Sequence, residues 1–193
     1  MVCAFCAALC VAVTSLAVMG TGERGTDVAL QVTGRLSFLL FFPAYAGSAM
    51  ATLFGPKFQQ MRQHATDLGL AFAAAHVVHL GLVGWLCWIG AAPPLSAFVF
   101  FGVAVVFTYV FVLFSINRLQ SVLGNRGRWL LWTVGLNYIA YAFAEDFLNN
   151  PLGGGPWHVA EYLPFGILAI SGPILRVTAF SLRISQRQRI FGG

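Results

Sequence analysis

The stretch from Thr66 to Gly90 decides the fold, and it reads TDLGLAFAAAHVVHLGLVGWLCWIG. After Asp67 it contains no Asp, Glu, Lys or Arg, and it exceeds the roughly 20 residues that a helix needs to cross a bilayer. Two histidines, His76 and His79, stand near its middle. Ionisable side chains at that depth are costly, so this pair marks a candidate functional site.

The composition of the whole chain extends this interpretation. Of the 193 residues, 59% are hydrophobic and 9% are charged, and the mean hydropathy is +0.79. These values exclude a water-soluble globular domain. The sequence therefore predicts an all-α, multi-pass membrane protein with a single transmembrane domain over residues 1–193. Segments of bilayer-spanning length lie at residues 3–19, 31–54, 67–90, 95–116, 129–148 and 158–180.

Basic residues predict the orientation of this six-helix bundle, because Lys and Arg in short loops favour the cytoplasmic side. The loops on the opposite side contain Arg24 as their one basic residue. Both termini are therefore predicted to be cytoplasmic in a bacterial inner membrane, with a short basic tail from Leu182. The second loop, the fourth loop and the tail carry Lys57, Arg62, Arg118, Arg126, Arg128, Arg183, Arg187 and Arg189.

The net charge of +5 follows from this asymmetry and from adhesion of the inner face to anionic lipid headgroups. The lipid bilayer is therefore the expected partner, and a nucleic acid is not needed to explain the charge.

The first apolar segment, residues 3–19, fits either a retained helix or the apolar region of a secretory signal. We favour a retained helix, because no basic stretch precedes it and no A-x-A site follows it. Cys3, Cys6 and Cys10 share one face of this helix, which would suit a soft metal ion. Buried thiols more often behave as small apolar groups. The number and spacing of the cysteines do not indicate a set of disulfide bonds.

Depth places the histidine pair near the midplane of the bilayer. At a rise of about 1.5 Å per residue, His76 lies about 15 Å and His79 about 20 Å above the inner end of their span. Residues at this spacing face the same part of a bundle, so one could bind a metal while the other supports it. The alternative is that each histidine hydrogen-bonds a carbonyl, Ser, Thr or Asn of a neighbouring helix. For the pair, we favour metal or cofactor binding.

The other two histidines lie near the ends of spans. His64 is expected to be an exposed loop residue at the cytoplasmic interface. His158 opens the last span at the outer interface, where Glu161, Glu145 and Asp146 add carboxylates. This outer cluster suits a docking or ion site, and it equally suits a solvated rim.

Two arginines lie within apolar segments, Arg35 in the second and Arg176 in the sixth. Snorkelling of the guanidinium to the headgroups is the ordinary explanation for both. If a cofactor that carries carboxylates occupies the bundle, Arg35 becomes a suitable counter-ion.

Several stretches resemble a known family. Thr33-Gly34-Arg35 precedes an apolar run to Pro43 and a basic loop, and Leu68-Gly69-Leu70 then leads to His79. Gly127-Arg128-Trp129 opens the fifth span. Together these stretches, over about half of the chain, resemble the ferric reductase-like transmembrane domain. That family includes the haem-binding membrane partner of the periplasmic methionine sulfoxide reductase.

This resemblance implies haem b bound by His79, because the family's Leu-Gly-Leu motif precedes a haem ligand by this spacing. One departure limits the implied ligand set. The family usually has Leu-His after the tryptophan of span five, whereas this chain has Leu131-Trp132 and no histidine from residue 80 to 157. Bis-histidine ligation between spans three and five is therefore excluded. A single five-coordinate haem on His79 or His76 remains chemically sound.

His158 is a poor second ligand, because it would lie on the order of 10 Å higher than His79 by helical rise. His64, fifteen residues before His79 in the sequence, could not share one haem with it.

Three functional hypotheses follow. The first is a haem-b electron-transfer subunit of an oxidoreductase. Its electrons would come from quinol or a separate reductase, because no G-x-G-x-x-G turn or nucleotide-binding module follows the last span. They would pass to a protein or metal acceptor at the outer face. Asn137, Tyr138 and Tyr141 would then line a cofactor or quinone cleft, or they would simply bond between helices.

The second hypothesis is a haem-free scaffold or assembly subunit of the same fold, in which Trp129 and Trp132 fill the space of a porphyrin. The third is a small transporter or metal-handling protein that uses His76, His79 and Asn137. An internal repeat, which many transporters have, is absent from the sequence.

Overall fold

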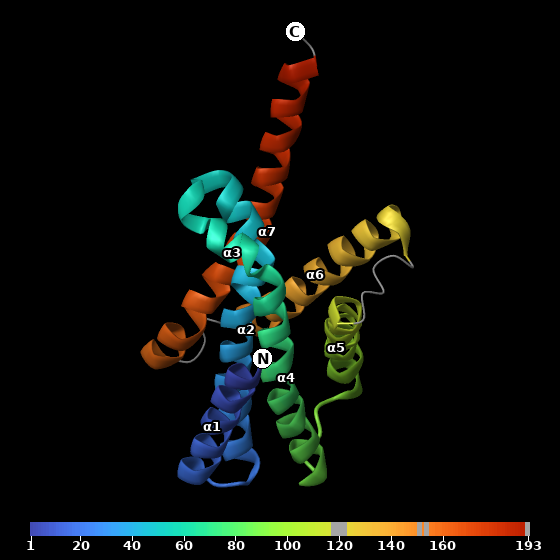
Figure 1. Cartoon of the computed structure of the whole chain (residues 1–193). Coiled ribbons are helices and arrows are strands. Elements are labelled where there is room, and N and C mark those ends of the chain that lie inside the picture. The colour runs from blue at the N-terminus through green and yellow to red at the C-terminus, as the bar shows by residue number, and fades with distance from the viewer. Residues whose placement is uncertain (117–122, 150–151, 153–154, 192–193) are drawn as a thin grey trace. The chain divides into compact units, whose positions relative to one another are not determined.

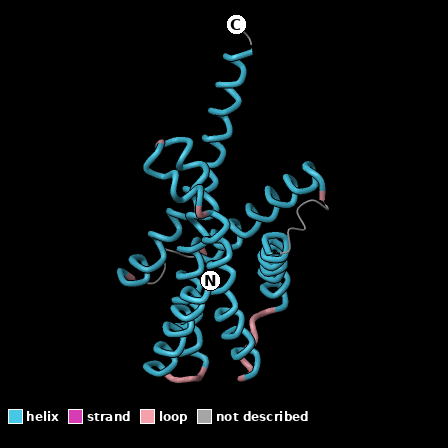
Figure 2. The backbone as a smooth tube through the Cα atoms, in the orientation of Figure 1, coloured by secondary structure: helices cyan, strands magenta, loops and turns pink. Residues whose placement is uncertain are grey.

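We describe a computed structural model that covers residues 1–116, 123–149, 152 and 155–191. Every regular element within these residues is helical, as Figure 2 shows for the described part of the backbone. The all-α prediction is thereby confirmed. The elements are α1 (Val2–Met19), α2 (Glu23–Phe54), η1 (Pro56–Phe58), α3 (Gln59–Gln63), α4 (Ala65–Trp88), α5 (Leu95–Ile116), α6 (Gly124–Leu148) and α7 (Pro156–Phe191), and Figure 1 labels the seven α-helices.

Five helices in the described part of the chain are long and apolar enough to cross a membrane: α1, α2, α4, α5 and α7. This gives the chain the character of a multi-pass integral membrane protein. Helix α6 is not one of the five, although it covers the predicted fifth span. Its sequence includes Asn137 and Tyr138 and, near its end, Glu145 and Asp146, which lower its mean hydropathy.

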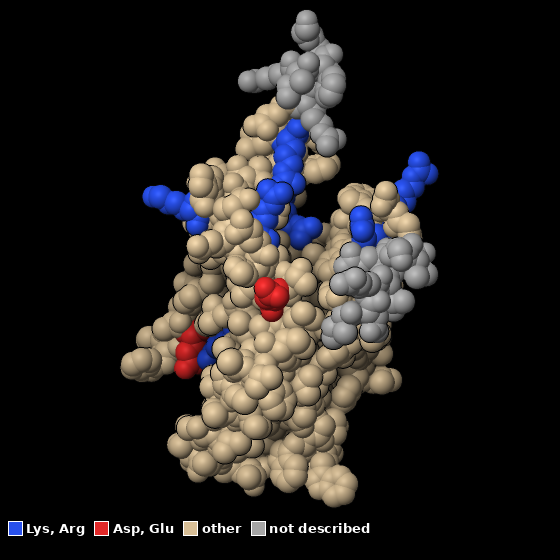
Figure 3. Space-filling view, viewed as in Figure 1, with Lys and Arg blue, Asp and Glu red and all other residues tan. Residues whose placement is uncertain are grey.

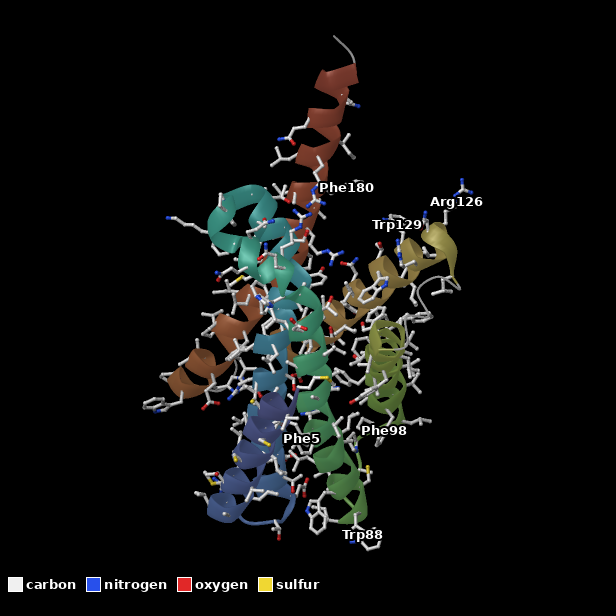
Figure 4. The ribbon with its side chains drawn as sticks, in the orientation of Figure 1. Phe5, Trp88, Phe98, Arg126, Trp129 and Phe180 are labelled. Atoms are coloured by element: carbon white, nitrogen blue, oxygen red, sulfur yellow. The ribbon has the colours of Figure 1, made fainter. Side chains whose placement is uncertain are left out.

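Large apolar side chains face outward, as a lipid-facing surface requires. Phe5, Phe98, Trp129 and Phe180 are exposed, and Figure 4 shows them projecting from their helices. Trp88, at the end of α4, is 83% exposed. Tryptophans near helix ends are typical of the boundary between lipid tails and headgroups.

The helix ends differ from the predicted spans. Helix α2 begins at Glu23 rather than at residue 31, directly after Gly20 ends α1 with a φ of 87°. Helix α7 continues to Phe191, so the predicted short tail from Leu182 is part of a long helix. Hydropathy marks where the apolar region ends, whereas Arg, Gln and Leu continue a helix beyond it.

Some predicted features fall outside what the structure describes. Arg118 of the fourth loop is one of them, and so are the side chains of Arg187 and Arg189 in the basic tail.

Two compact units make up the chain, and each is discontinuous in sequence. Unit 1 comprises Met1–Phe41 and Thr66–Ile139, and unit 2 comprises Phe42–Ala65 and Ala140–Gly193. In unit 1, small side chains let the helices approach closely. The core cluster of this unit consists of Ala8, Ala12, Ala29, Ala75, Val78 and Leu82.

Helices α2 and α4 are antiparallel within unit 1. Thr33 contacts His79, and eight positions further along α2 the ring of Phe41 lies 5.3 Å from that of Phe72, nearer the start of α4. Trp85 fixes the far end of α4, because its Nε1 donates a hydrogen bond to the Thr21 carbonyl oxygen at 3.0 Å. These contacts set the register that positions the histidines.

Helices α5 and α6 are also antiparallel. Phe111 stacks on Trp132 with ring centroids 4.4 Å apart and an interplanar angle of 5°, and the Tyr138 hydroxyl donates to the Phe100 carbonyl oxygen at 3.0 Å. Gly135 is buried, and a Cβ there would lie 2.7 Å from Cδ1 of Phe107. The absence of a side chain at Gly135 therefore lets α6 lie against the phenylalanines of α5.

Candidate functional site

His79 is held by a hydroxyl group of α2. Oγ1 of Thr33 lies 3.1 Å from Nδ1 of His79. The single hydrogen of this hydroxyl goes to carbonyl oxygens one turn earlier, those of Ala29 at 2.7 Å and Leu30 at 3.2 Å. With its hydrogen so directed, the Thr33 hydroxyl is available to accept from the imidazole, and in that tautomer Nδ1 carries the proton and Nε2 keeps its lone pair.

The local sequence of α2 explains why a hydroxyl stands there. Thr26, Thr33 and Ser37 are fully buried and recur at helical spacing, so they share one face of α2. Threonine in a helix commonly donates to the carbonyl four residues earlier, which leaves its oxygen as an acceptor. Next to Thr33, a Cβ on Gly34 would lie 3.5 Å from Cε1 of His79. The backbone of α2 at Gly34 is therefore close enough to the imidazole ring for a Cβ to be in van der Waals contact with it.

His76 and His79 face the same side of α4, as their spacing predicts. Their ring centroids are 5.2 Å apart with an interplanar angle of 12°, and Phe72 lies 5.4 Å from the other side of His76. Two nearly parallel rings on one helix cannot sit on opposite faces of one iron. The two histidines therefore could not both bind the same iron from opposite sides.

Two buried polar atoms near this pair have no hydrogen-bond partner in the described part of the chain: Nδ1 of His76 and Oγ of Ser37. The α2–α4 register places Ser37 between Thr33, which meets His79, and Phe41, which meets Phe72. Ser37 is therefore level with His76. Orphaned buried polar atoms are uncommon in proteins and point to a bound water or ligand.

Residues predicted to assist the site have varied surroundings. Arg35 is half-buried on α2. Nδ2 of Asn137 donates to the Thr133 carbonyl oxygen at 2.7 Å, within its own helix. The hydroxyl of Tyr138 is bonded to α5, and it lines a wide, open groove with Leu95, Ser96, Val99, Phe100 and Val103. Tyr141 is exposed.

The predicted outer cluster lies in unit 2. His158 stacks on Tyr162, with centroids 4.3 Å apart and an interplanar angle of 20°, while Glu145, Asp146 and Glu161 are exposed. Over residues 1–116, 123–149, 152 and 155–191, no three His, Cys, Asp or Glu side chains gather into a metal-binding group.

The cysteines are free thiols. Cys3, Cys6 and Cys10 are exposed on α1, and Cys87 is half-buried. The interpretation of the first three as buried apolar groups is therefore wrong, because their face of α1 points away from α2 and α4. The buried positions of α1 are Ala8 and Ala12.

The contact between His79 and Thr33 is of the kind given as the alternative for the pair, a hydrogen bond to a Ser or Thr of a neighbouring helix. The sequence did not single out Thr33 or Ser37 for such a role. The available signal was the helical recurrence of hydroxyl residues on the buried face of α2. Comparison with protein-family models, with curated proteins and with solved structures finds no match to this chain.

Proposed function

We propose that this chain is a membrane-embedded haem-b protein that transfers electrons, with His79 as an axial ligand of the iron. The observation that carries the proposal is the hydrogen bond from Nδ1 of His79 to Thr33. A histidine that binds a metal through one nitrogen usually donates the other N–H to a neighbouring oxygen. Such a bond fixes the tautomer and the ring orientation.

The residues around His79 fit one axial position of a five-coordinate haem. A bound haem b would supply one-electron chemistry at its iron. The chain's own residues orient the imidazole through Thr33 and place Arg35 on the adjoining helix for a carboxylate. His76 packs against His79 and shields it from one side.

Electrons would enter from quinol or a separate reductase and leave to an acceptor at the outer face.

We also infer six membrane crossings, with both termini cytoplasmic. Helix α7 runs parallel to the second half of α2, because Arg176 contacts Tyr45 and Arg183, seven positions on, contacts Thr52. Successive spans alternate in direction, so two parallel spans are separated by an odd number of crossings. Helices α4 and α5 alone would place an even number of crossings between α2 and α7. The parallel directions of α2 and α7 therefore require α6 to cross the membrane as well. The bias of basic residues then favours the inner side for both termini.

A haem-free scaffold is the second candidate, and one observation favours it. Trp132 stands at the position of the histidine in the Leu-His step of the ferric reductase-like family, and it stacks closely on Phe111. The two rings would then support the α5–α6 packing in place of a cofactor contact.

The decisive experiment is a reduced-minus-oxidised absorption spectrum of the detergent-purified protein, made with ample haem, together with a pyridine haemochrome assay of haem per chain. We expect a b-type signal that His79→Ala abolishes while membrane insertion persists. His64→Ala, at the end of α3, is the matched histidine control and should keep the signal.

Absence of haem in the wild-type protein would overturn the proposal in favour of the scaffold. Haem that survives His79→Ala but not His76→Ala would assign the ligand to His76 and contradict the argument from Thr33.

A further inference from the structure

A guanidinium group lies within the apolar part of α7, in unit 2. Cζ of Arg176 is 4.5 Å from the centroid of the Tyr45 ring, and its Nη1 donates to the Tyr45 carbonyl oxygen at 3.3 Å. Arg176 is half-buried, and neither contact brings a negative charge. A cation in an apolar segment is costly unless an anion or water compensates it.

The position of this guanidinium is built into the packing of two helices. A Cβ on Gly172 would lie 3.0 Å from Cε1 and 3.2 Å from Cδ1 of Tyr45. The tyrosine ring therefore rests on the backbone of α7 at Gly172, and Arg176, one turn later, covers the ring. A side chain held in this way is not free to snorkel to the nearest headgroup.

The arrangement repeats two turns further along. Nη2 of Arg183 donates to Oγ1 of Thr52 at 2.6 Å and lies 3.4 Å from Oγ of Ser48. Arg176 and Arg183 are seven residues apart, so they share one face of α7 and are separated by about 10 Å along the axis. We call this line of contacts the α2–α7 seam, and it consists of Tyr45, Ser48, Thr52, Gly172, Arg176 and Arg183.

Apolar side chains stand beside the basic ones. Val177, next to Arg176, and Phe180, one turn after it, are 66% and 62% exposed. Phe180 projects outward in Figure 4. On the face seen in Figure 3, basic side chains gather over the second half of α7. Fixed cations next to an exposed apolar surface are the chemistry that matches an anionic headgroup with its acyl chains.

We propose that the α2–α7 seam binds the phosphate group of an anionic phospholipid. A planar guanidinium has five N–H donors in a fork that matches phosphate oxygens, and Arg176 uses one of its nitrogens for protein. The hydroxyls of Ser48 and Thr52 orient Arg183 toward the same ligand. The acyl chains lie along the apolar side chains of α7. This inference is independent of haem.

The test is native mass spectrometry of the delipidated, detergent-purified chain titrated with phosphatidylglycerol or phosphatidylcholine. We expect the wild-type protein to retain phosphatidylglycerol preferentially, and each of Arg176→Gln and Arg183→Gln to weaken that binding about fivefold. Arg126→Gln removes the same charge from an exposed arginine that projects from α6 in Figure 4, and it should leave the affinity unchanged.

Arg183 is exposed, so Arg183→Gln tests the seam even if Arg176→Gln fails to fold. Equal retention of both lipids, or equal weakening by Arg126→Gln, would overturn the proposal. Competition with inorganic phosphate tests whether the seam recognises a lipid or free phosphate. Displacement of phosphatidylglycerol by an equal concentration of inorganic phosphate would show a site for free phosphate, contrary to our inference.

Discussion

The hydroxyl oxygen of Thr33 accepts a hydrogen bond from Nδ1 of His79 across the α2–α4 interface, at 3.1 Å. Because the hydroxyl hydrogen is directed at Ala29 in α2, this contact favours the imidazole tautomer with the proton on Nδ1. Nε2 is thereby left as the nitrogen that can bind a metal. A residue on a second helix thus sets the chemistry of the histidine.

Removal of this acceptor should weaken the candidate site. Thr33→Val keeps the shape but leaves the Nδ1 hydrogen unpaired, so we expect affinity for haem to fall about 10- to 100-fold. Thr33→Ser keeps the hydroxyl and is the matched control. The measurement is the rate at which each purified variant loses haem to an apo-haem acceptor in excess. Equal rates for Thr33→Val and wild type would show that the contact does not support the ligand.

The same pair makes a prediction that does not need haem. Thr33→Val leaves a buried N–H unsatisfied, so it should lower the free energy of unfolding of the haem-free protein by about 1–3 kcal/mol. Thermal unfolding in detergent measures this, again with Thr33→Ser as the control.

Ser37 and His76 should be coupled energetically. Their orphaned polar atoms lie at the same level of the α2–α4 interface, and one water bonded to both would satisfy them. A double-mutant cycle with Ser37→Ala and His76→Leu should then give an interaction energy of about 0.5–3 kcal/mol, measured by unfolding of the haem-free protein. Additive effects of the two substitutions would argue against a shared water.

Gly135→Ala should destabilise the packing of α5 on α6. The new methyl group would meet Phe107 and Phe111, and overpacking of this kind costs about 1–3 kcal/mol. Gly102→Ala, in α5, is the control, because a Cβ there has no atom within 4 Å and the change favours the helix by up to about 1 kcal/mol. Thermal unfolding of both variants measures the difference. Equal stability of the two would mean that the phenylalanines move aside freely.

Six crossings predict a specific labelling pattern. In a variant whose four native cysteines are replaced by alanine, we expect Gln63→Cys and Ser185→Cys to be protected from a membrane-impermeant maleimide in intact cells, and Ala92→Cys to react. Detergent should expose all three. Opposite accessibility of Gln63→Cys and Ser185→Cys would contradict the parallel directions of α2 and α7.

The sequence by itself determined the membrane character of the chain and the positions of most helices. Residues 95–116 were predicted to be a span and form α5, because apolar side chains in lipid require a backbone that satisfies its own hydrogen bonds. The start of α2 and the length of α7 were missed, since hydropathy reports the apolar region and not where a helix ends. The likeness to ferric reductase-like proteins stays a prediction, and so does haem binding.

The candidate site also has features that the sequence determined and features that only the tertiary structure decided. Spacing along α4 was enough to place His76 and His79 on one face, because the helical repeat is a local property. The roles of Thr33 and Ser37, and the seam between Tyr45 and Arg176, were decided by the tertiary structure alone. They depend on the register of helices distant in sequence. That register follows from contacts such as those of His79 with the backbone at Gly34 and of Tyr45 with the backbone at Gly172, and it cannot be read from either helix by itself.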